Sequence, residues 1–154
     1  MPNFRKARFV FPDGSIKFMR IKIKPSTVPK AGKGAFADKD IPKGAYAVYR
    51  GKISTNPDKT NMLYSWELYD YDPKTGKTKD DIIGYVDASK RDKSTNFARY
   101  VNCGPTSKAN NMESVQKYDK VRYVATRDIK AGEELFTDYG EEYRRDNLGM
   151  KGKY

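Results

Sequence analysis

Three stretches of this chain carry residues whose types and spacing could do chemistry. Gly32-Lys33-Gly34 sets two glycines around one residue, so the backbone can approach a ligand without Cβ atoms in the way. Asn102 follows the apolar Val101 and precedes Cys103-Gly104-Pro105, and its amide can donate and accept hydrogen bonds at once. Tyr139 ends an apolar run before Gly140, which would present a phenol at the end of a strand. Taken singly, the first two stretches are more typical of ordinary turns, and the third is a common pattern for a packed strand-end tyrosine.

The composition excludes several kinds of catalytic site. The chain of 154 residues has no histidine, and Cys103 is its only cysteine. This excludes Ser-His-Asp and Cys-His machinery, histidine-bound metals, an intramolecular disulfide and a zinc cluster of several thiolates. We therefore expect no metal site. The chemistry must use carboxylates, lysine, amides, an organic cofactor, or the 12 tyrosines.

The net charge of +11 is concentrated at the two ends of the chain. Residues 1–30 carry eight lysines and arginines against one acid, and residues 144–154 carry four against one. Residues 31–143 are close to neutral. Basic ends favour polyanions such as nucleic acid or chromatin through counterion release. A role in solubility alone explains them equally well.

The elements that must position these stretches are short strands. Met19, Ile21 and Ile23 alternate with basic residues, which is typical of a half-exposed strand. Further strands are expected at 45–49, 82–86, 121–125 and 135–139, with one helical turn at 96–101. We predict a mostly β fold of several small sheets with little helix and long connections. The expected organisation is a basic N-terminal segment 1–17, a domain at 18–143, and a basic, partly disordered tail at 144–154.

One internal repeat links two of the expected strands. Asp40-Ile41-Pro42-Lys43-Gly44 and Asp128-Ile129-Lys130-Ala131-Gly132 share the pattern Asp-Ile-x-x-Gly, and each precedes a strand-like run. They predict two similar turns that feed two strands. No apolar stretch approaches the length of a membrane span, and no signal-peptide core follows Met1, so we expect a soluble, intracellular protein.

Together the three stretches resemble the SET-domain family of protein lysine methyltransferases over about residues 20–148. The segment 32–37 looks like that family's first motif, and 132–140 looks like its closing motif. Cys103 stands where most members have histidine, as in the PR subclass, which Tyr64-Ser65-Trp66, Tyr85-Val86-Asp87 and the segment 139–143 also resemble. The resemblance implies a β-clip-like SET domain with a C-terminal pseudoknot.

The resemblance also implies a cofactor, S-adenosylmethionine, and a role for each matching residue. Tyr139 would be the catalytic tyrosine, with Tyr49 and Tyr123 lining a channel for the substrate lysine. The residues implied in cofactor binding are Gly32, Lys33, Gly34, Tyr64, Trp66, Asn102, Cys103 and Tyr143. A channel of tyrosine rings would strip water from the lysine and favour its neutral, nucleophilic form.

The expected function is methyl transfer from S-adenosylmethionine to a protein lysine, with the histone H3 tail as the substrate that the resemblance implies. Another protein substrate stays open, as does a weak or inactive module that binds chromatin, peptide or nucleic acid. The basic termini predict non-specific nucleic-acid contact and no membrane. In a eukaryotic or viral setting, a histone substrate would imply a nuclear or chromatin-associated protein.

Overall fold

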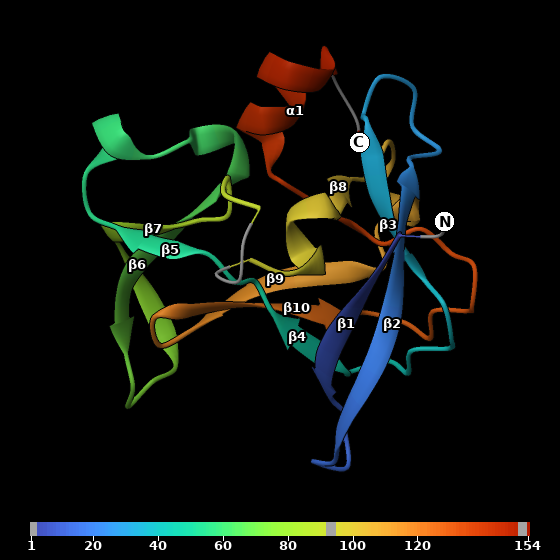
Figure 1. Cartoon of the computed structure of the whole chain (residues 1–154). Helices are drawn as coiled ribbons and strands as arrows, with labels where there is room; N and C mark the ends of the chain where they lie inside the picture. The colour runs from blue at the N-terminus through green and yellow to red at the C-terminus, as the bar shows by residue number, and fades with distance from the viewer. Residues whose placement is uncertain (1–2, 92–94, 151–153) are drawn as a thin grey trace.

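The computed structural model describes residues 3–91, 95–150 and 154, which form two β-sheets and a short C-terminal helix (Figure 1). In this described part, the larger sheet has the strand order β3-β2-β1-β4-β10-β9-β11-β8, and the smaller sheet has the order β5-β7-β6. The mostly β prediction is confirmed. The strands are β1 (Asn3–Val10), β2 (Ile16–Pro25), β3 (Lys33–Ala37), β4 (Tyr46–Val48), β5 (Lys52–Ser54), β6 (Ser65–Asp72), β7 (Lys77–Asp87), β8 (Asn102–Cys103), β9 (Met112–Lys117), β10 (Lys120–Ala125) and β11 (Phe136–Thr137). The helical elements are the 3-10 turns η1 (Pro57–Lys59), η2 (Met62–Tyr64), η3 (Phe97–Tyr100) and η4 (Ser107–Ala109), and the helix α1 (Glu141–Leu148).

The strand predicted from the alternation at 19–23 lies within β2, which pairs with β1 in antiparallel register from end to end. Ala7 and Phe9 of β1 and Ile21 of β2 turn inward and are almost fully buried, while their neighbours in the chain face outward. The period of two therefore places one face of this ribbon on the core. The segment 1–17, which the sequence sets apart from the domain, thus contributes β1 to the larger sheet.

The helical turn predicted at 96–101 is η3, and it anchors the core. The Asn96 side chain caps it by accepting a hydrogen bond of 3.0 Å from the Ala98 amide. Phe97 is fully buried and stacks on Phe9, with ring centroids 5.7 Å apart. This contact ties the segment before Asn102 to the β1–β2 ribbon, so the core fixes where that amide emerges.

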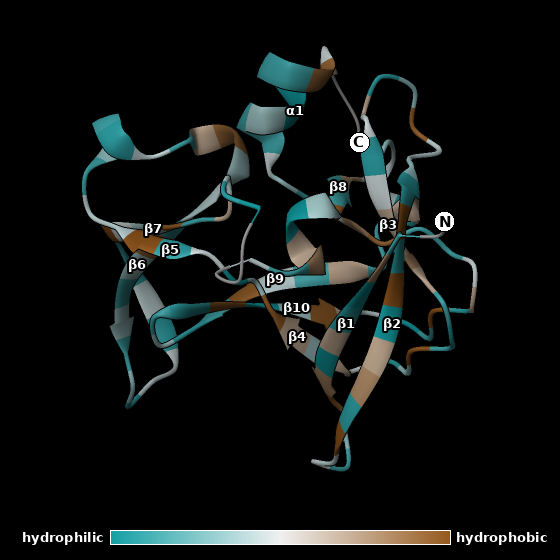
Figure 2. Cartoon of the chain, in the orientation of Figure 1, coloured by the Kyte–Doolittle hydropathy of each residue, from teal (hydrophilic) through white to brown (hydrophobic). Residues whose placement is uncertain are grey.

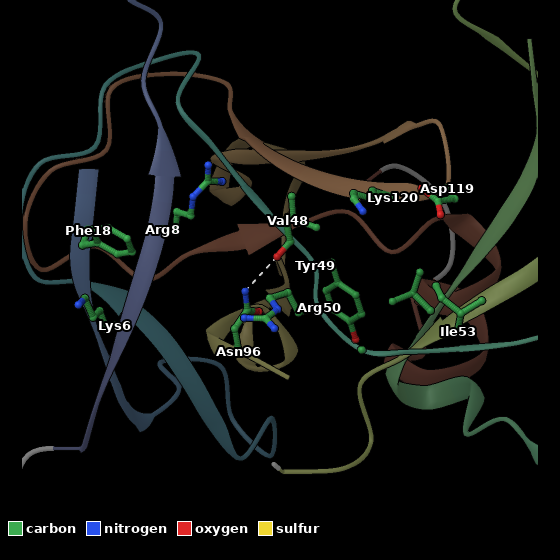
Figure 3. Close-up of a pocket in the computed structure, with 12 residues that line it drawn as sticks. Lys6, Arg8, Phe18, Val48, Tyr49, Arg50, Ile53, Asn96, Asp119 and Lys120 are labelled. Atoms are coloured by element: carbon green, nitrogen blue, oxygen red, sulfur yellow. Dashed lines mark hydrogen bonds between the residues drawn. The ribbon is translucent and has the colours of Figure 1, made fainter. Parts of the chain in front are cut away.

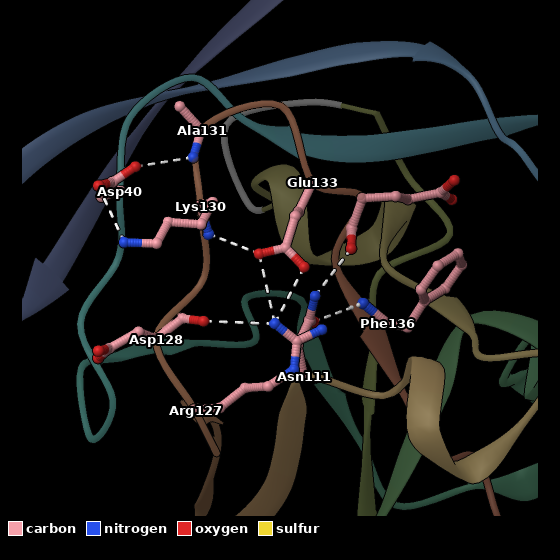
Figure 4. Close-up of polar contacts among 9 residues, drawn as sticks. Asp40, Asn111, Arg127, Asp128, Lys130, Ala131, Glu133 and Phe136 are labelled. Atoms are coloured by element: carbon pink, nitrogen blue, oxygen red, sulfur yellow. Dashed lines mark hydrogen bonds and ion pairs between the residues drawn. The ribbon is translucent and has the colours of Figure 1, made fainter.

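The C-terminal part of the chain threads between two earlier segments. β11 pairs in parallel with β8 on one side and with Met112 of β9 on the other. The fully buried Asn111 clamps it there, because its Nδ2 donates to Glu134 O (2.9 Å) and its Oδ1 accepts from the Phe136 amide (3.0 Å) (Figure 4). This threading matches the pseudoknot that the resemblance implied, and it brings Tyr139 next to the segment at 101–103.

The two Asp-Ile-x-x-Gly turns brace each other. Ile41 and Ile129 exchange backbone hydrogen bonds of 2.8 Å. Asp40 Oδ1 accepts from the Ala131 amide (2.8 Å), and Asp128 Oδ1 accepts from the Lys43 amide (2.9 Å), as Figure 4 shows for the first of these. Each aspartate therefore accepts a hydrogen bond from a backbone N–H group of the other turn. The predicted pair of similar turns is confirmed, and they feed β4 and β11.

The tail expected at 144–154 begins inside α1, which continues to Leu148. Residues 151–153 lie outside the described part of the chain, so partial disorder there stays a prediction. This helix is largely hydrophilic (Figure 2), with Glu141 and Glu142 in its first turn, where the helix dipole favours acids. Beyond it, the Tyr154 hydroxyl donates to Gly104 O (2.7 Å). No helix in the part of the chain that the structure describes is long and apolar enough to cross a membrane.

Candidate active site

A pocket of about 670 Å³ lies where η2, β6, η3, β8 and α1 meet. Its size is in the usual range for small-molecule and cofactor sites. Of the residues singled out from the sequence, six line it: Tyr49, Tyr64, Trp66, Asn102, Tyr139 and Tyr143. The motif Gly32-Lys33-Gly34 adjoins it through Ala31, whereas Tyr123 and Cys103 are buried behind its wall.

Aromatic rings form one wall of the pocket. Tyr49, Trp66 and Tyr123 contact one another, with ring centroids 5.4–6.5 Å apart. The ring of Trp66 also contacts that of Tyr139, with centroids 5.5 Å apart, and the ring of Tyr139 contacts that of Tyr143 of α1, with centroids 4.7 Å apart. The rings meet mostly edge to face, an arrangement that aromatic pairs favour. The tyrosines chosen from the sequence are thus brought together.

The hydroxyl groups of this wall are held by hydrogen bonds. Tyr49 donates to Tyr64 O (2.6 Å), and Tyr139 donates to Val101 O. Because each O–H is committed to a carbonyl, the lone pairs of both phenol oxygens are left to accept a hydrogen bond. Tyr123 is different, since it is fully buried and accepts from Trp66 Nε1 (2.7 Å). It therefore orients the indole ring.

Burial raises the pKa of Tyr49, Tyr123 and Tyr139 above the ordinary value for tyrosine. For Tyr139, the neighbouring phenol of Tyr49 adds to this effect on the pKa. All three phenols are therefore neutral at physiological pH. They can orient a ligand by hydrogen bonding, but they cannot act as a negative counter-charge or as a strong base.

The position of Glu134 explains why residue 34, the second glycine of Gly32-Lys33-Gly34, has no side chain. Its buried carboxylate accepts hydrogen bonds from Ser26 Oγ (2.6 Å), from the Thr27 amide (2.8 Å) and from Thr27 Oγ1 (2.7 Å). A Cβ on Gly34 would collide with Glu134 Oε2 and lie 3.3 Å from Ser26 Cα. Gly32 has a positive φ of 71°. The motif is therefore shaped by a carboxylate from the segment preceding β11.

Asn102 joins the glycine motif to the threaded segment. Its Nδ2 donates to Lys33 O at 3.0 Å and lies 3.5 Å from Glu134 Oε2. Cys103 accepts a hydrogen bond from the Tyr139 amide, with 3.5 Å between N and Sγ, and burial raises the pKa of its thiol. The thiol is therefore protonated, and it positions the backbone of Tyr139.

Sequence reasoning missed Arg99, which lines the pocket from η3. Its side chain is buried and donates to Ala88 O (2.9 Å) and Ser89 O (3.4 Å). The guanidinium lies over the rings of Tyr64 and Tyr100, with 4.6 and 4.8 Å to the centroids. It forms no ion pair with any residue in 3–91, 95–150 or 154. Its charge is thus available to an anionic group of a ligand.

Sequence reasoning also missed the acidic rim of the pocket. Four exposed carboxylates line it, namely Glu67, Glu141, Glu142 and Asp146. Glu67 lies on β6, and the other three lie on α1, which the sequence did not predict. In a chain with a net charge of +11, this rim favours a cationic ligand.

Comparisons with known proteins agree with this arrangement. The family model described as "PR domain zinc finger protein 2, PR domain" matches residues 21–149. Human histone-lysine N-methyltransferase PRDM7 is 32% identical over 133 residues, which cover 85% of this chain and 25% of that protein. The Caenorhabditis elegans histone-lysine N-methyltransferase set-17 is 30% identical over 124 residues, which cover 79% of this chain and 41% of that protein. This chain thus spans less than half of either relative.

Solved structures give the same result. The methyltransferase domain of human PR domain-containing protein 2 superposes with a TM-score of 0.60 and 27% identity, covering 79% of this chain and 78% of that one. The SET domain of the RIZ1 tumor suppressor (PRDM2) gives a TM-score of 0.58 at 27% identity, covering 80% and 72%. The matched region holds the glycine motif, Asn102 and Tyr139. This chain belongs to the PR subclass of SET-domain proteins.

Proposed function

We propose that this chain is a protein-lysine N-methyltransferase that uses S-adenosylmethionine and acts on a histone tail. The observation that carries the proposal is the pocket itself, in which a buried cation, a wall of neutral phenols and an acidic rim converge. The names of the two curated relatives, both histone-lysine N-methyltransferases, support it.

The residues of the pocket fit S-adenosylmethionine. Arg99 offers a buried guanidinium to the carboxylate of the cofactor. The carboxylate would supply the anionic partner that this guanidinium lacks among the described residues. Backbone at Gly32 and the amide of Asn102 would line the cofactor, with the ring of Tyr143 against the adenine. When bound, S-adenosylmethionine supplies an electrophilic methyl group on a sulfonium.

The chain's own part in the reaction is to dehydrate and align the lysine. The rings of Tyr49, Trp66 and Tyr139 exclude water, which lowers the pKa of a lysine amine that enters among them. The phenol oxygens of Tyr49 and Tyr139 accept hydrogen bonds from the neutral amine, because their own protons point to backbone carbonyls. The lone pair of the amine is then free to face the methyl group.

The acidic rim supports a basic protein segment as the substrate class. Glu141, Glu142 and Asp146 place negative charge on the α1 side of the pocket, which would favour a lysine- and arginine-rich histone tail. Asp146 shares its charge with the exposed Arg145 at 3.3 Å. By family resemblance we propose histone H3, and hence a nuclear, chromatin-associated protein. We also propose that the basic termini, 1–17 and 144–154, add non-specific contacts to nucleic acid.

The test is transfer of a labelled methyl group from S-adenosylmethionine to core histones. We expect label on histone H3, and a roughly tenfold higher KM for an H3 peptide when Glu141, Glu142 and Asp146 become amides, with kcat little changed. The matched control neutralises three exposed acids outside the pocket, Asp58, Asp80 and Asp81. Cofactor binding without transfer to any histone would point to another protein substrate. The absence of cofactor binding would favour a non-catalytic docking module.

A further inference from the structure

A second hollow, the basic groove, runs between the β1–β2 ribbon and the segment that follows β4 (Figure 3). Its volume is about 710 Å³. Figure 3 shows Lys6 and Arg8 at one end, Arg50 in the middle and Lys120 at the other end. Asp119 is the only acid among the described residues that line it. Positive charge therefore extends along the whole groove.

The four cations are exposed and available. None of them forms an ion pair with a residue in the described ranges. Lys6 Nζ lies 4.6 Å from the centroid of Phe18, an exposed ring at the end of the groove. This contact holds the ammonium over the outer face of the ribbon, where it faces solvent.

The outer face of the ribbon gathers like charges at a cost to stability. Lys6 stands directly opposite Arg20 in the β1–β2 register, and Arg8 lies on the same face. Like charges directly opposite each other destabilise an antiparallel pair. Arg20 is paired with Asp38, with 3.8 Å between Nε and Oδ2, whereas Lys6 and Arg8 have no acidic partner among the described residues. Their positive charge is therefore left for an anionic ligand.

The groove and the candidate active site have opposite charge. Tyr49 lines both, so only its side chain and its neighbours separate the basic groove from the acid-rimmed pocket. A ligand with a basic tail beside a polyanion would match both surfaces at once. Histones wrapped in DNA have this combination.

We propose that the basic groove docks the phosphate backbone of duplex DNA. Arg8, Arg50 and Lys120 come from three separate segments, and Figure 3 shows them spread in a row along the groove. Duplex DNA carries one negative charge per ~1.7 Å, which such a row can contact without reading sequence. The choice of DNA over an acidic peptide rests on the proposed function, because a histone substrate brings duplex DNA alongside. The basic groove would thus give the nucleic-acid contact that we propose for the termini a defined surface.

The test uses a labelled duplex of mixed sequence and measures fluorescence anisotropy across a series of salt concentrations, without cofactor. The groove variant changes Lys6, Arg8, Arg50 and Lys120 to glutamine. The matched control changes four exposed lysines elsewhere to glutamine, Lys59, Lys74, Lys77 and Lys108. Both variants lose the same charge, and thermal melting confirms that both fold.

We expect the groove variant to bind DNA at least roughly tenfold more weakly than the control, with a log K against log salt slope shallower by about 3–4. Equal affinity and slope in the two variants would overturn the proposal, because binding would then reflect net charge alone. Preference of the wild-type chain for polyglutamate over DNA would overturn it in favour of an acidic protein partner.

A second readout separates this proposal from the proposed function. Methyl transfer to recombinant nucleosomes should fall in the groove variant, while transfer to a free H3 peptide stays as in the control. Loss of both activities in the groove variant would contradict a docking role. A wild-type chain that binds DNA through the groove but methylates no histone would refute the proposed function and leave the groove intact.

Discussion

Gly34→Ala should destabilise the protein through Glu134, and a double-mutant cycle can show it. The new methyl group would collide with the Glu134 carboxylate, which three hydrogen bonds from Ser26 and Thr27 hold in place. Hydrogen bonds to a charged group contribute about 1.5–3 kcal/mol each. Weakening them should lower the free energy of unfolding by about 3 kcal/mol, and Glu134→Ala should lower it by a similar amount.

The double variant Gly34→Ala/Glu134→Ala tests whether the cost of the methyl group at position 34 depends on the Glu134 carboxylate. Once Glu134 is alanine, the methyl group at 34 meets no carboxylate, and its remaining close neighbour is Ser26 Cα at 3.3 Å. The double variant should therefore be within about 1 kcal/mol of Glu134→Ala alone, which corresponds to a coupling of about 2 kcal/mol. Gly32→Ala is the control, since it meets no atom within 4 Å but has a positive φ, and it should cost about 1 kcal/mol.

Equilibrium unfolding in urea measures all four variants, with a titration of S-adenosylmethionine in parallel. Cofactor affinity should fall in Gly34→Ala, because the Ser26–Gly34 segment loses its support. Strict additivity of the costs of Gly34→Ala and Glu134→Ala would refute this reasoning. So would a Gly34→Ala variant as stable as the wild-type protein.

Three further outcomes are expected. Tyr123→Phe should lower the free energy of unfolding by about 1–3 kcal/mol in urea titration, because it leaves the indole N–H of Trp66 without its acceptor. Burial raises the pKa of Tyr123 and Tyr139 in the folded protein, so the unfolded chain releases these protons at a lower pH, from about pH 10. Thermal melting should therefore show the folded state losing stability as the pH rises above about 10. A melting temperature that does not change with pH in this range would contradict this. Tyr154→Phe should cost about 1–3 kcal/mol in the same urea assay, because it removes the bond donated to Gly104 O and the acceptor of Asn110 Nδ2, and an unchanged midpoint would exclude that role.

The sequence was sufficient to find the strands with clear alternation and the motif residues. Ile21 and Ile23 are buried at period two, and the two Asp-Ile-x-x-Gly segments form similar turns as expected. The pairing of these turns through Ile41 and Ile129 was not expected. The strand β1 was harder, because basic and aromatic residues are mixed along it, and its register is set by pairing with β2. A pattern within one segment cannot reveal a partner strand.

The parts of the site that sequence reasoning missed depend on contacts between distant segments. Glu134 accepts hydrogen bonds from Ser26 and Thr27, about a hundred residues earlier and just before the glycine motif, and no local pattern in the sequence marks it. Arg99 lies three residues before Asn102, but its proposed role depends on the lack of an ion-pair partner among the described residues. The acidic rim required α1, whose polar sequence indicated a loose tail. This helix has no buried residue, and it is favoured by the acids of its first turn and by the left-handed C-cap at Gly149.

The most direct measurement is mass spectrometry of an H3 peptide after incubation with S-adenosylmethionine and either the wild-type chain or Tyr139→Phe. We predict one or more added methyl groups on a lysine with the wild-type chain. Transfer should fall sharply with Tyr139→Phe, which should still fold and bind the cofactor, because it loses one hydroxyl and keeps its ring contacts with Trp66 and Tyr143. Undiminished transfer by Tyr139→Phe would contradict the role of this phenol in aligning the lysine.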